Sequence, residues 1–210
     1  MQVALELLPF DRRAPVRALD LGIGTGYFAA QFLNEFPSGT VVGVDVAQAM
    51  LDLAATRLGD CADRAELRLG DVRALDDDLG TFDAMLSSYT FHHLDRAEKV
   101  AVVRAGLALL RPGGWLLNAD LVVSEHPSVE QRIQELRVEG IVRRAAGRDE
   151  RFADAEATRR FLDDVGRRDA DRPLTLAEDL DVMCEAGLCE AAVYWLEYRE
   201  AVWGGRRTDA

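Results

Sequence analysis

The sequence of 210 residues has little cysteine, a single lysine and no long apolar run. Its three cysteines, Cys61, Cys184 and Cys189, are too few and too irregularly spaced to predict a disulfide framework or a zinc site. We expect them to be small buried apolar groups, and we expect no metal site. No stretch approaches the roughly 20 apolar residues of a membrane span, so no membrane association is expected. The N-terminus lacks the basic region of a secretory signal, which favours a cytoplasmic location.

Positive charge is also scarce, because 37 acidic residues outnumber 25 basic ones and the formal net charge is −12. A field of this sign repels phosphate backbones, so nucleic acid is not an expected partner. The basic residues other than Lys99 are arginines, and pairs such as Arg143-Arg144 alternate with acids, which is typical of solvated helix faces. With 49% apolar and 30% charged residues, the composition is that of a globular protein and excludes a disordered or fibrous one.

Short apolar strands alternate with helical stretches in the first half of the chain, which is typical of a parallel sheet flanked by helices. We predict helices at 3–8, 27–36, 47–58 and after Asp95, and strands at 16–21, 40–44, 65–69, 82–87 and 115–122. A helix is expected between each strand and the next, so the crossovers should be right-handed and the sheet doubly wound. The stretch from Arg111 to Gly114 predicts a turn before the last of these strands.

Residues 124–174 interrupt this alternation and predict two or three helices packed over the edge of the sheet. Thr175 and Glu178 form a capping-box pattern that starts another helix, and Gly187 ends it. Segments 190–199 and 200–207 follow without an intervening helix, so we expect two antiparallel strands joined by a tight reversal. We interpret residues 1–210 as a single domain with a helical insertion at about 124–174.

Candidate binding residues follow the strands, because ligands of open parallel sheets lie at the carboxyl ends of the strands. After the first strand, Gly22, Gly24 and Gly26 allow a tight turn and a close approach of the backbone to a ligand. They also expose amide groups at the start of a helix to an anionic group. The run Gly24 to Ala29 satisfies the looser dinucleotide pattern as well, so a nicotinamide oxidoreductase is one alternative.

Acidic residues follow the next strands. Asp45 is placed to accept hydrogen bonds from two ribose hydroxyls, and Asp71 to accept one from an adenine amine. Ser87, after the fourth strand, is expected near the other end of the ligand. Asp20, before the glycines, would repel a pyrophosphate but attract an ammonium group. An adenosine with a cationic sulfonium amino-acid tail, S-adenosylmethionine, fits all four positions.

Several segments together resemble class I S-adenosylmethionine-dependent methyltransferases of the group that acts on small molecules. The run Asp20 to Gly26 is similar to the glycine-rich signature of that family, Val44-Asp45 to its ribose-binding acid and Gly70-Asp71-Val72 to its adenine-binding step. Three further segments resemble stretches of the same family. Ser87 to Leu94 is similar to its strand-four stretch, Leu110 to Gly114 to its turn before strand five, and Glu185 to Leu188 to its common ending before the last two strands.

The resemblance implies a three-layer, Rossmann-like α/β fold with a seven-stranded sheet of order 3-2-1-4-5-7-6 and strand 7 antiparallel. It implies S-adenosylmethionine as the cofactor and methyl transfer to a small-molecule acceptor by in-line displacement. Asp20, the three glycines, Asp45, Asp71, Val72 and Ser87 are the cofactor-binding residues that we carry over from it. The acceptor, the atom that is methylated and the choice between monomer and homodimer stay open.

Some other side chains near these motifs are also expected at the ligand, and for most of them core packing is the alternative. Val46 and Met50 are expected to form apolar walls for the adenine, with core packing as the alternative for Met50. Tyr27 either covers the methionine moiety or packs beneath the first helix. Tyr194 and Trp195 alternate on a strand, so at most one faces the pocket, and core packing is the default for the other.

His92 and His93 follow the fourth strand, where an acceptor would approach. Either is a candidate general base if the acceptor must lose a proton, and Tyr89 could line the same site. The alternative is that both histidines belong to a loop that caps the next helix. His126, after the fifth strand, is expected to face solvent.

The start of the chain departs from the family pattern. Relatives often carry a few dozen residues before the opening helix, and these form a lid over cofactor and substrate, whereas the first strand here begins about 15 residues in. Either the chain lacks that segment, or the helices of 124–174 cover the site and shape the acceptor pocket. A protein that binds the cofactor without methylating is therefore a second alternative.

Overall fold

A seven-stranded sheet of order β3-β2-β1-β4-β5-β7-β6 organises the computed structural model, which describes residues 1–188 and 190–208. The strands are β1 (Arg17–Leu21), β2 (Thr40–Asp45), β3 (Ala65–Leu69), β4 (Phe82–Ser88), β5 (Leu110–Leu121), β6 (Ala192–Glu197) and β7 (Glu200–Arg206). β1 to β5 run parallel to one another, and β7 runs antiparallel to both β5 and β6. The predicted strand order and the antiparallel last strand are confirmed.

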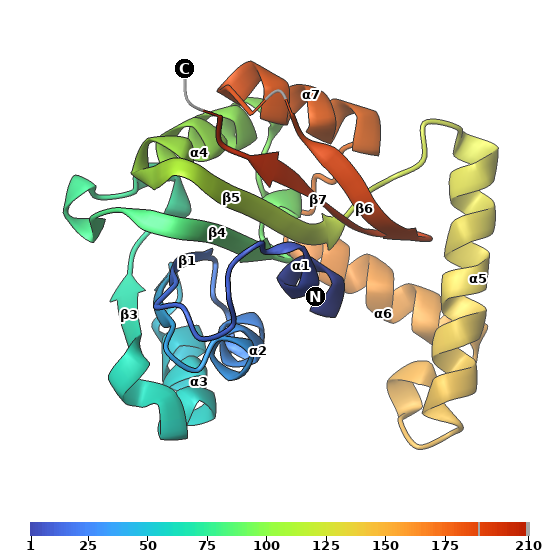
Figure 1. Cartoon of the computed structure of the whole chain (residues 1–210). Coiled ribbons are helices and arrows are strands. Elements are labelled where there is room, and N and C mark those ends of the chain that lie inside the picture. Colours follow the sequence, from blue (N-terminus) through green and yellow to red (C-terminus); the bar gives the residue numbers. More distant parts are fainter. Residues whose placement is uncertain (189, 209–210) are drawn as a thin grey trace.

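Helices cover both faces of this sheet (Figure 1). The α-helices are α1 (Gln2–Leu7), α2 (Tyr27–Glu35), α3 (Gln48–Leu58), α4 (Arg96–Leu109), α5 (Pro127–Ala145), α6 (Ala155–Arg168) and α7 (Leu176–Ala186). Single-turn or short 3₁₀ helices are η1 (Gly59–Arg64), η2 (Val72–Ala74), η3 (Asp77–Leu79), η4 (Phe91–His93) and η5 (Glu150–Phe152). The side chains of α1, α2 and α3 share one core cluster, and those of α4 and α7 share the other.

The apolar strands of the first half are explained by these two cores. Leu19 and Leu21 of β1 belong to the cluster beneath α4 and α7, whereas Ala18, which directly precedes Leu19, belongs to the cluster beneath α1 to α3. Successive side chains of a strand point to opposite faces, so a strand covered on both sides needs apolar residues at consecutive positions. Because β1 pairs in parallel with both β2 and β4, the carboxyl ends of these three strands lie side by side.

The capping residues predicted for two helices are confirmed. Asp95 and Glu98 form a capping box at the start of α4, and Thr175 and Glu178 form one at the start of α7. Gly187 ends α7 with a φ of 111°, a conformation that glycine adopts without a steric penalty.

Two connections differ from the prediction. β3 and β4 are joined by the 3₁₀ helices η2 and η3 within residues 70–81, in place of the expected α-helix. The expected turn from Arg111 to Gly114 lies inside β5, where the pairing with β4 shifts register. Gly114 permits this course, because a Cβ there would lie 2.9 Å from the carbonyl oxygen of Asp83.

The prediction that all three cysteines are buried is wrong for Cys184, which is exposed on α7. Its neighbour Met183 faces the core, and consecutive helical residues point about 100° apart. Cys61 is half-buried, and its sulfur lies 3.1 Å from Nη2 of Arg64. Cys189 lies outside the described residues. Within the described part of the chain, no helix has both the length and the apolar character to span a membrane.

The only lysine, Lys99, is buried and holds α4 to α7. Its Nζ lies 2.8 Å from Oδ1 of Asp179, and both side chains are 1% exposed. Burial raises the pKa of Asp179 to about 6, and the positive charge of Lys99 opposes this rise. A buried charge needs a partner, so each member of the pair depends on the other.

We predict that Lys99→Met lowers the free energy of unfolding by about 3–5 kcal/mol, because Asp179 would be left in the core without its counter-charge. The double variant Lys99→Met/Asp179→Leu should recover most of this loss, since no uncompensated charge remains. Urea unfolding followed by circular dichroism measures both values. A loss of less than about 1 kcal/mol in the single variant would be inconsistent with a pair that bridges the two helices.

Candidate active site

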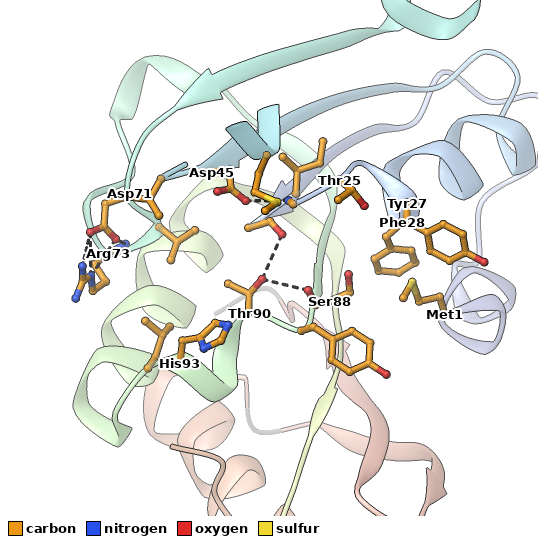
Figure 2. A pocket seen from close by; sticks show the side chains of 18 residues that line it. Met1, Thr25, Tyr27, Phe28, Asp45, Asp71, Arg73, Ser88, Thr90 and His93 are labelled. Atoms are coloured by element: carbon orange, nitrogen blue, oxygen red, sulfur yellow. Dashed lines mark hydrogen bonds and ion pairs between the residues drawn. The ribbon is translucent and has the colours of Figure 1, made fainter. Parts of the chain in front are cut away.

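A cavity of about 570 Å³ opens where the glycine-rich turn after β1, the end of β2, η2 and the loop after β4 meet (Figure 2). Its volume lies in the range of small-molecule sites. Of the residues expected at the cofactor or acceptor, the following line it: Gly22, Gly24, Asp45, Val46, Met50, Asp71, Val72 and His93, with Tyr27 and Tyr89. Most of the sequence prediction therefore converges on one cavity.

The glycine-rich turn is held against the loop after β4. The Oγ1 atom of Thr90 lies 3.2 Å from the carbonyl oxygen of Gly22 and 3.1 Å from that of Ser88 (Figure 2). A Cβ at Gly22, which has a φ of +66°, would lie 2.2 Å from that same Oγ1. Only glycine lets the two segments approach so closely.

Asp45 lies at the end of β2 and is almost fully buried. One carboxylate oxygen accepts a hydrogen bond from the amide of Gly24 at 2.8 Å, and the other accepts one from Ala47 at 2.9 Å. A carboxylate has about four acceptor positions, so both oxygens keep capacity for a ligand. Val46 and Met50 are exposed side chains on the same cavity, so Met50 is not a core residue.

Asp71 lies at one end of the cavity and Tyr27 at the other, with Asp45 between them (Figure 2). Arg73 binds the Asp71 carboxylate, with Nη2 2.6 Å from Oδ2 and the backbone amide 2.9 Å from Oδ1. These hydrogen bonds hold the pKa of Asp71 below its usual range. Tyr27 is half-exposed, with the guanidinium carbon of Arg57 5.4 Å from the centre of its ring.

Three residues expected at the cofactor do not line the cavity. Gly26 instead lets α2 pack on α3, since a Cβ there would lie 3.1 Å from Ala54. Ser87 is buried within the sheet, and its neighbour Ser88 reaches the cavity in its place because side chains alternate along a strand. Asp20 is buried beneath the glycine turn.

The electrostatic role expected of Asp20 also changes. Burial, and next the charge of Asp45, raise the pKa of the Asp20 carboxyl to about 8. At neutral pH the protonated form of the group is therefore favoured, which weakens the negative charge that we expected to attract an ammonium group.

The loop after β4 is organised by Asp120, a fully buried residue near the end of β5. Its Oδ2 accepts hydrogen bonds from the backbone amides of Thr90, Phe91 and His92 at 3.1, 2.7 and 3.2 Å. Its Oδ1 lies 2.5 Å from Nδ1 of His92. An ionised carboxylate can only accept, so Nδ1 of a neutral His92 carries the proton and Nε2 carries the lone pair.

A second cavity of about 1100 Å³ lies between this loop, β5 and the helices α5 and α6. Tyr89 and His93 line both cavities, so the two adjoin. His92 faces only the second one. α5 and α6 stand beyond the carboxyl ends of β4 and β5 (Figure 1).

Tyr89, at the boundary of the two cavities, has a φ of +49°, which is uncommon for a residue other than glycine. Burial raises the pKa of its phenol, and the charge of Glu200 adds to the rise.

Sequence reasoning missed Asp120 and Thr90, which hold the loop, and Asp171, which meets the two histidines. Asp120 could have been found, because it lies at the carboxyl end of the fifth strand, where we had considered only His126. His126 is exposed, as expected. Tyr194 and Trp195 both pack partly buried against the same core cluster, where alternation predicted opposite faces, and the pairing of β6 with β7 shifts register between Val193 and Trp195.

Comparisons with known proteins agree with this geometry. Residues 18–114 match the family model of a methyltransferase domain. An uncharacterized methyltransferase of Anoxybacillus flavithermus is 30% identical over 124 residues, which are 59% of this chain and 56% of that protein. The chain thus matches little more than half the length of such curated relatives.

Solved structures share the fold. An O-methyltransferase family protein from Burkholderia thailandensis superposes with a TM-score of 0.67 at 18% identity, covering 100% of this chain and 56% of that one. A phosphoethanolamine N-methyltransferase of Haemonchus contortus, solved with S-adenosyl-L-methionine, gives 0.65 at 19% identity, covering 91% and 37%. The resemblance to class I S-adenosylmethionine-dependent methyltransferases is confirmed, and these findings support S-adenosylmethionine as the cofactor.

We predict that Asp20→Asn stabilises the protein increasingly as pH rises. The folded-state pKa of Asp20, about 8, lies above its ordinary value of 3.8. The wild type therefore has the full contribution of this group below about pH 4 and loses it as pH rises toward 8. Asparagine has no proton to lose, so the difference in free energy of unfolding should grow between pH 5 and pH 8 by up to about 4 kcal/mol. Urea unfolding at both pH values measures it, and an unchanged difference would contradict a raised pKa.

Proposed function

We propose that the chain binds S-adenosylmethionine in the first cavity and transfers its methyl group to a small-molecule acceptor held in the second. The observation that carries this proposal is the pair of adjoining cavities at the carboxyl ends of the strands, with Tyr89 and His93 on their common border. Methyl transfer needs such a border, because the acceptor atom must approach the methyl group from the side opposite the sulfur.

The residues of the first cavity fit the proposed cofactor in order. Asp45 would accept hydrogen bonds from the ribose, beside the apolar walls of Val46 and Met50. The adenine would lie toward Asp71 and Val72, and the methionine end toward Thr25 and Tyr27 (Figure 2). When bound, the cofactor supplies an electrophilic methyl group on a positively charged sulfur.

The protein's own contribution is chiefly to position the reactants, and effective-molarity arguments assign roughly 7–11 kcal/mol to positioning at best. For a hydroxyl acceptor it must also accept a proton. His92 suits that role better than His93, because Asp120 fixes its ring and leaves Nε2 free to accept a proton in the second cavity. The helical segment 124–174 would shape the acceptor pocket, since α5 and α6 line that cavity.

Experiments can distinguish the proposed methyltransferase from two alternative functions. A protein that binds the cofactor without methylating would use the same first cavity, but it would release no S-adenosylhomocysteine with any acceptor. A nicotinamide oxidoreductase is less well supported, because the family model and the relatives are those of methyltransferases. A cytoplasmic location and a monomeric or homodimeric state remain predictions.

We predict that Asp45→Ala weakens S-adenosylmethionine binding by about 2–4 kcal/mol, through the loss of two charge-assisted hydrogen bonds to the ribose. Isothermal titration calorimetry measures the affinity. Asp52→Ala is the matched control, because Asp52 is exposed on α3 and does not line the cavity. An affinity equal to that of the control would reject the ribose assignment.

We predict that His92→Asn lowers turnover of a hydroxyl acceptor by roughly 10²–10⁴-fold, the contribution typical of a general base. Asparagine can still donate a hydrogen bond to Asp120 but lacks the lone pair of Nε2. Affinity for S-adenosylmethionine should stay nearly unchanged, because His92 does not line the first cavity.

The matched control is His93→Asn, assayed likewise in the presence of a chelator, and we expect it to lose less than about tenfold. Release of S-adenosylhomocysteine measures both rates. If His92→Asn loses less than its control, His92 is not the base, whereas the cofactor assignment still depends on the calorimetry of Asp45→Ala.

A further inference from the structure

Three side chains with metal-binding atoms meet on the wall of the second cavity. His92, His93 and Asp171 each offer one nitrogen or oxygen, and the three atoms lie within 4.8 Å of one another. Oδ1 of Asp171 is 3.7 Å from Nε2 of His92 and 3.3 Å from Nδ1 of His93. The proposed methyl transfer uses only His92, so it does not explain why the other two side chains converge on the same point.

One carboxylate oxygen of Asp171 lacks a hydrogen bond that would explain its position. Its Oδ1 is shielded from solvent and has no hydrogen-bond partner among the described residues. A shielded anionic oxygen is costly unless a donor or a cation meets it. The two histidine nitrogens are nearby but do not form hydrogen bonds with it. A cation among the three atoms would satisfy all of them.

His92 is already oriented as metal-binding histidines are. Such residues usually donate their second ring N–H to a carboxylate or a carbonyl, which fixes the tautomer and makes the metal-facing nitrogen a better donor. Here the Nδ1 of His92 faces Oδ1 of the buried Asp120 at 2.5 Å, and Nε2 faces Asp171. The outer partner of a metal site is therefore present as well as three candidate ligands.

We propose that His92, His93 and Asp171 bind one divalent transition-metal ion of the Zn²⁺ class, with a fourth coordination position open to the second cavity. Two imidazoles and a carboxylate are a common ligand set for Zn²⁺, and three protein ligands leave one position for water or substrate. No spacing pattern indicates this site, because Asp171 follows α6 and is far from the two histidines along the chain.

This proposal goes beyond the proposed function and does not depend on it. Both concern His92, however, and an ion on Nε2 occupies the lone pair that a general base would use. Metal binding and proton acceptance by His92 therefore exclude one another within one molecule. For that reason the test of the site is a measurement of metal binding rather than of turnover.

The experiment treats the full chain with a chelator, removes the chelator, and titrates the protein with Co²⁺ and then Zn²⁺. We expect one equivalent of Co²⁺ to produce visible absorption of a four-coordinate site, and Zn²⁺ to abolish it. Calorimetry with Zn²⁺ gives the affinity. His93→Ala and Asp171→Asn should each weaken it by more than about tenfold, the lower end of what the loss of even an outer partner costs.

His126→Ala is the matched control, because His126 is exposed and outside the cluster. It should bind Zn²⁺ as the wild type does. His93 is 41% exposed, so its replacement should leave the fold intact, and it decides the question if Asp171→Asn proves unstable. The proposal is overturned if the wild type shows no saturable binding, in which case the cluster is an ion pair only. It is also overturned if His93→Ala binds Zn²⁺ as tightly as His126→Ala.

Discussion

The buried carboxylate of Asp120 is the contact on which both cavities depend. It accepts hydrogen bonds from the backbone amides of Thr90, Phe91 and His92, and it faces the His92 ring. One side chain at the end of β5 thereby fixes the whole path of the loop after β4. The loop carries Thr90 toward the glycine turn of the first cavity and His92 toward the second. Without Asp120, three buried amides would lose their acceptor, and neither cavity would keep its border.

The sheet explains why such a contact can form. β4 and β5 are parallel neighbours, so Asp120 and the residues that leave β4 arrive at the same edge. Asp45 has an equivalent place one strand beyond β1, where it accepts the amide of Gly24 and holds the other side of the first cavity. Asp120 and Asp45 thus fix the backbone on the two sides of the first cavity. The residues between them are available to contact a ligand.

Much of this could be predicted from the sequence, because it rests on local patterns. The burial of strands on both faces, the capping residues at Asp95 and Thr175 and the glycine turn before α2 are all visible in consecutive residues. The strand order followed from resemblance to a family, and the proposed cofactor rests on the same resemblance. Residue-level details followed less well: Asp20 and Ser87 lie behind the cavity because side-chain direction and burial depend on packing from other strands. The meeting of Asp171 with the histidines is set by how the segment after α6 returns to the sheet, which no local pattern encodes.

The most direct test of the account is a thermal-shift series with S-adenosylmethionine, S-adenosylhomocysteine, NAD and NADP, each added separately. A ligand at about 100 times its dissociation constant adds roughly 2.7 kcal/mol of stability, which raises the melting temperature by a few degrees. The account predicts a rise with the two sulfur nucleosides and none with the nicotinamide dinucleotides. A rise with NAD or NADP alone, or no rise with either sulfur nucleoside, would contradict it.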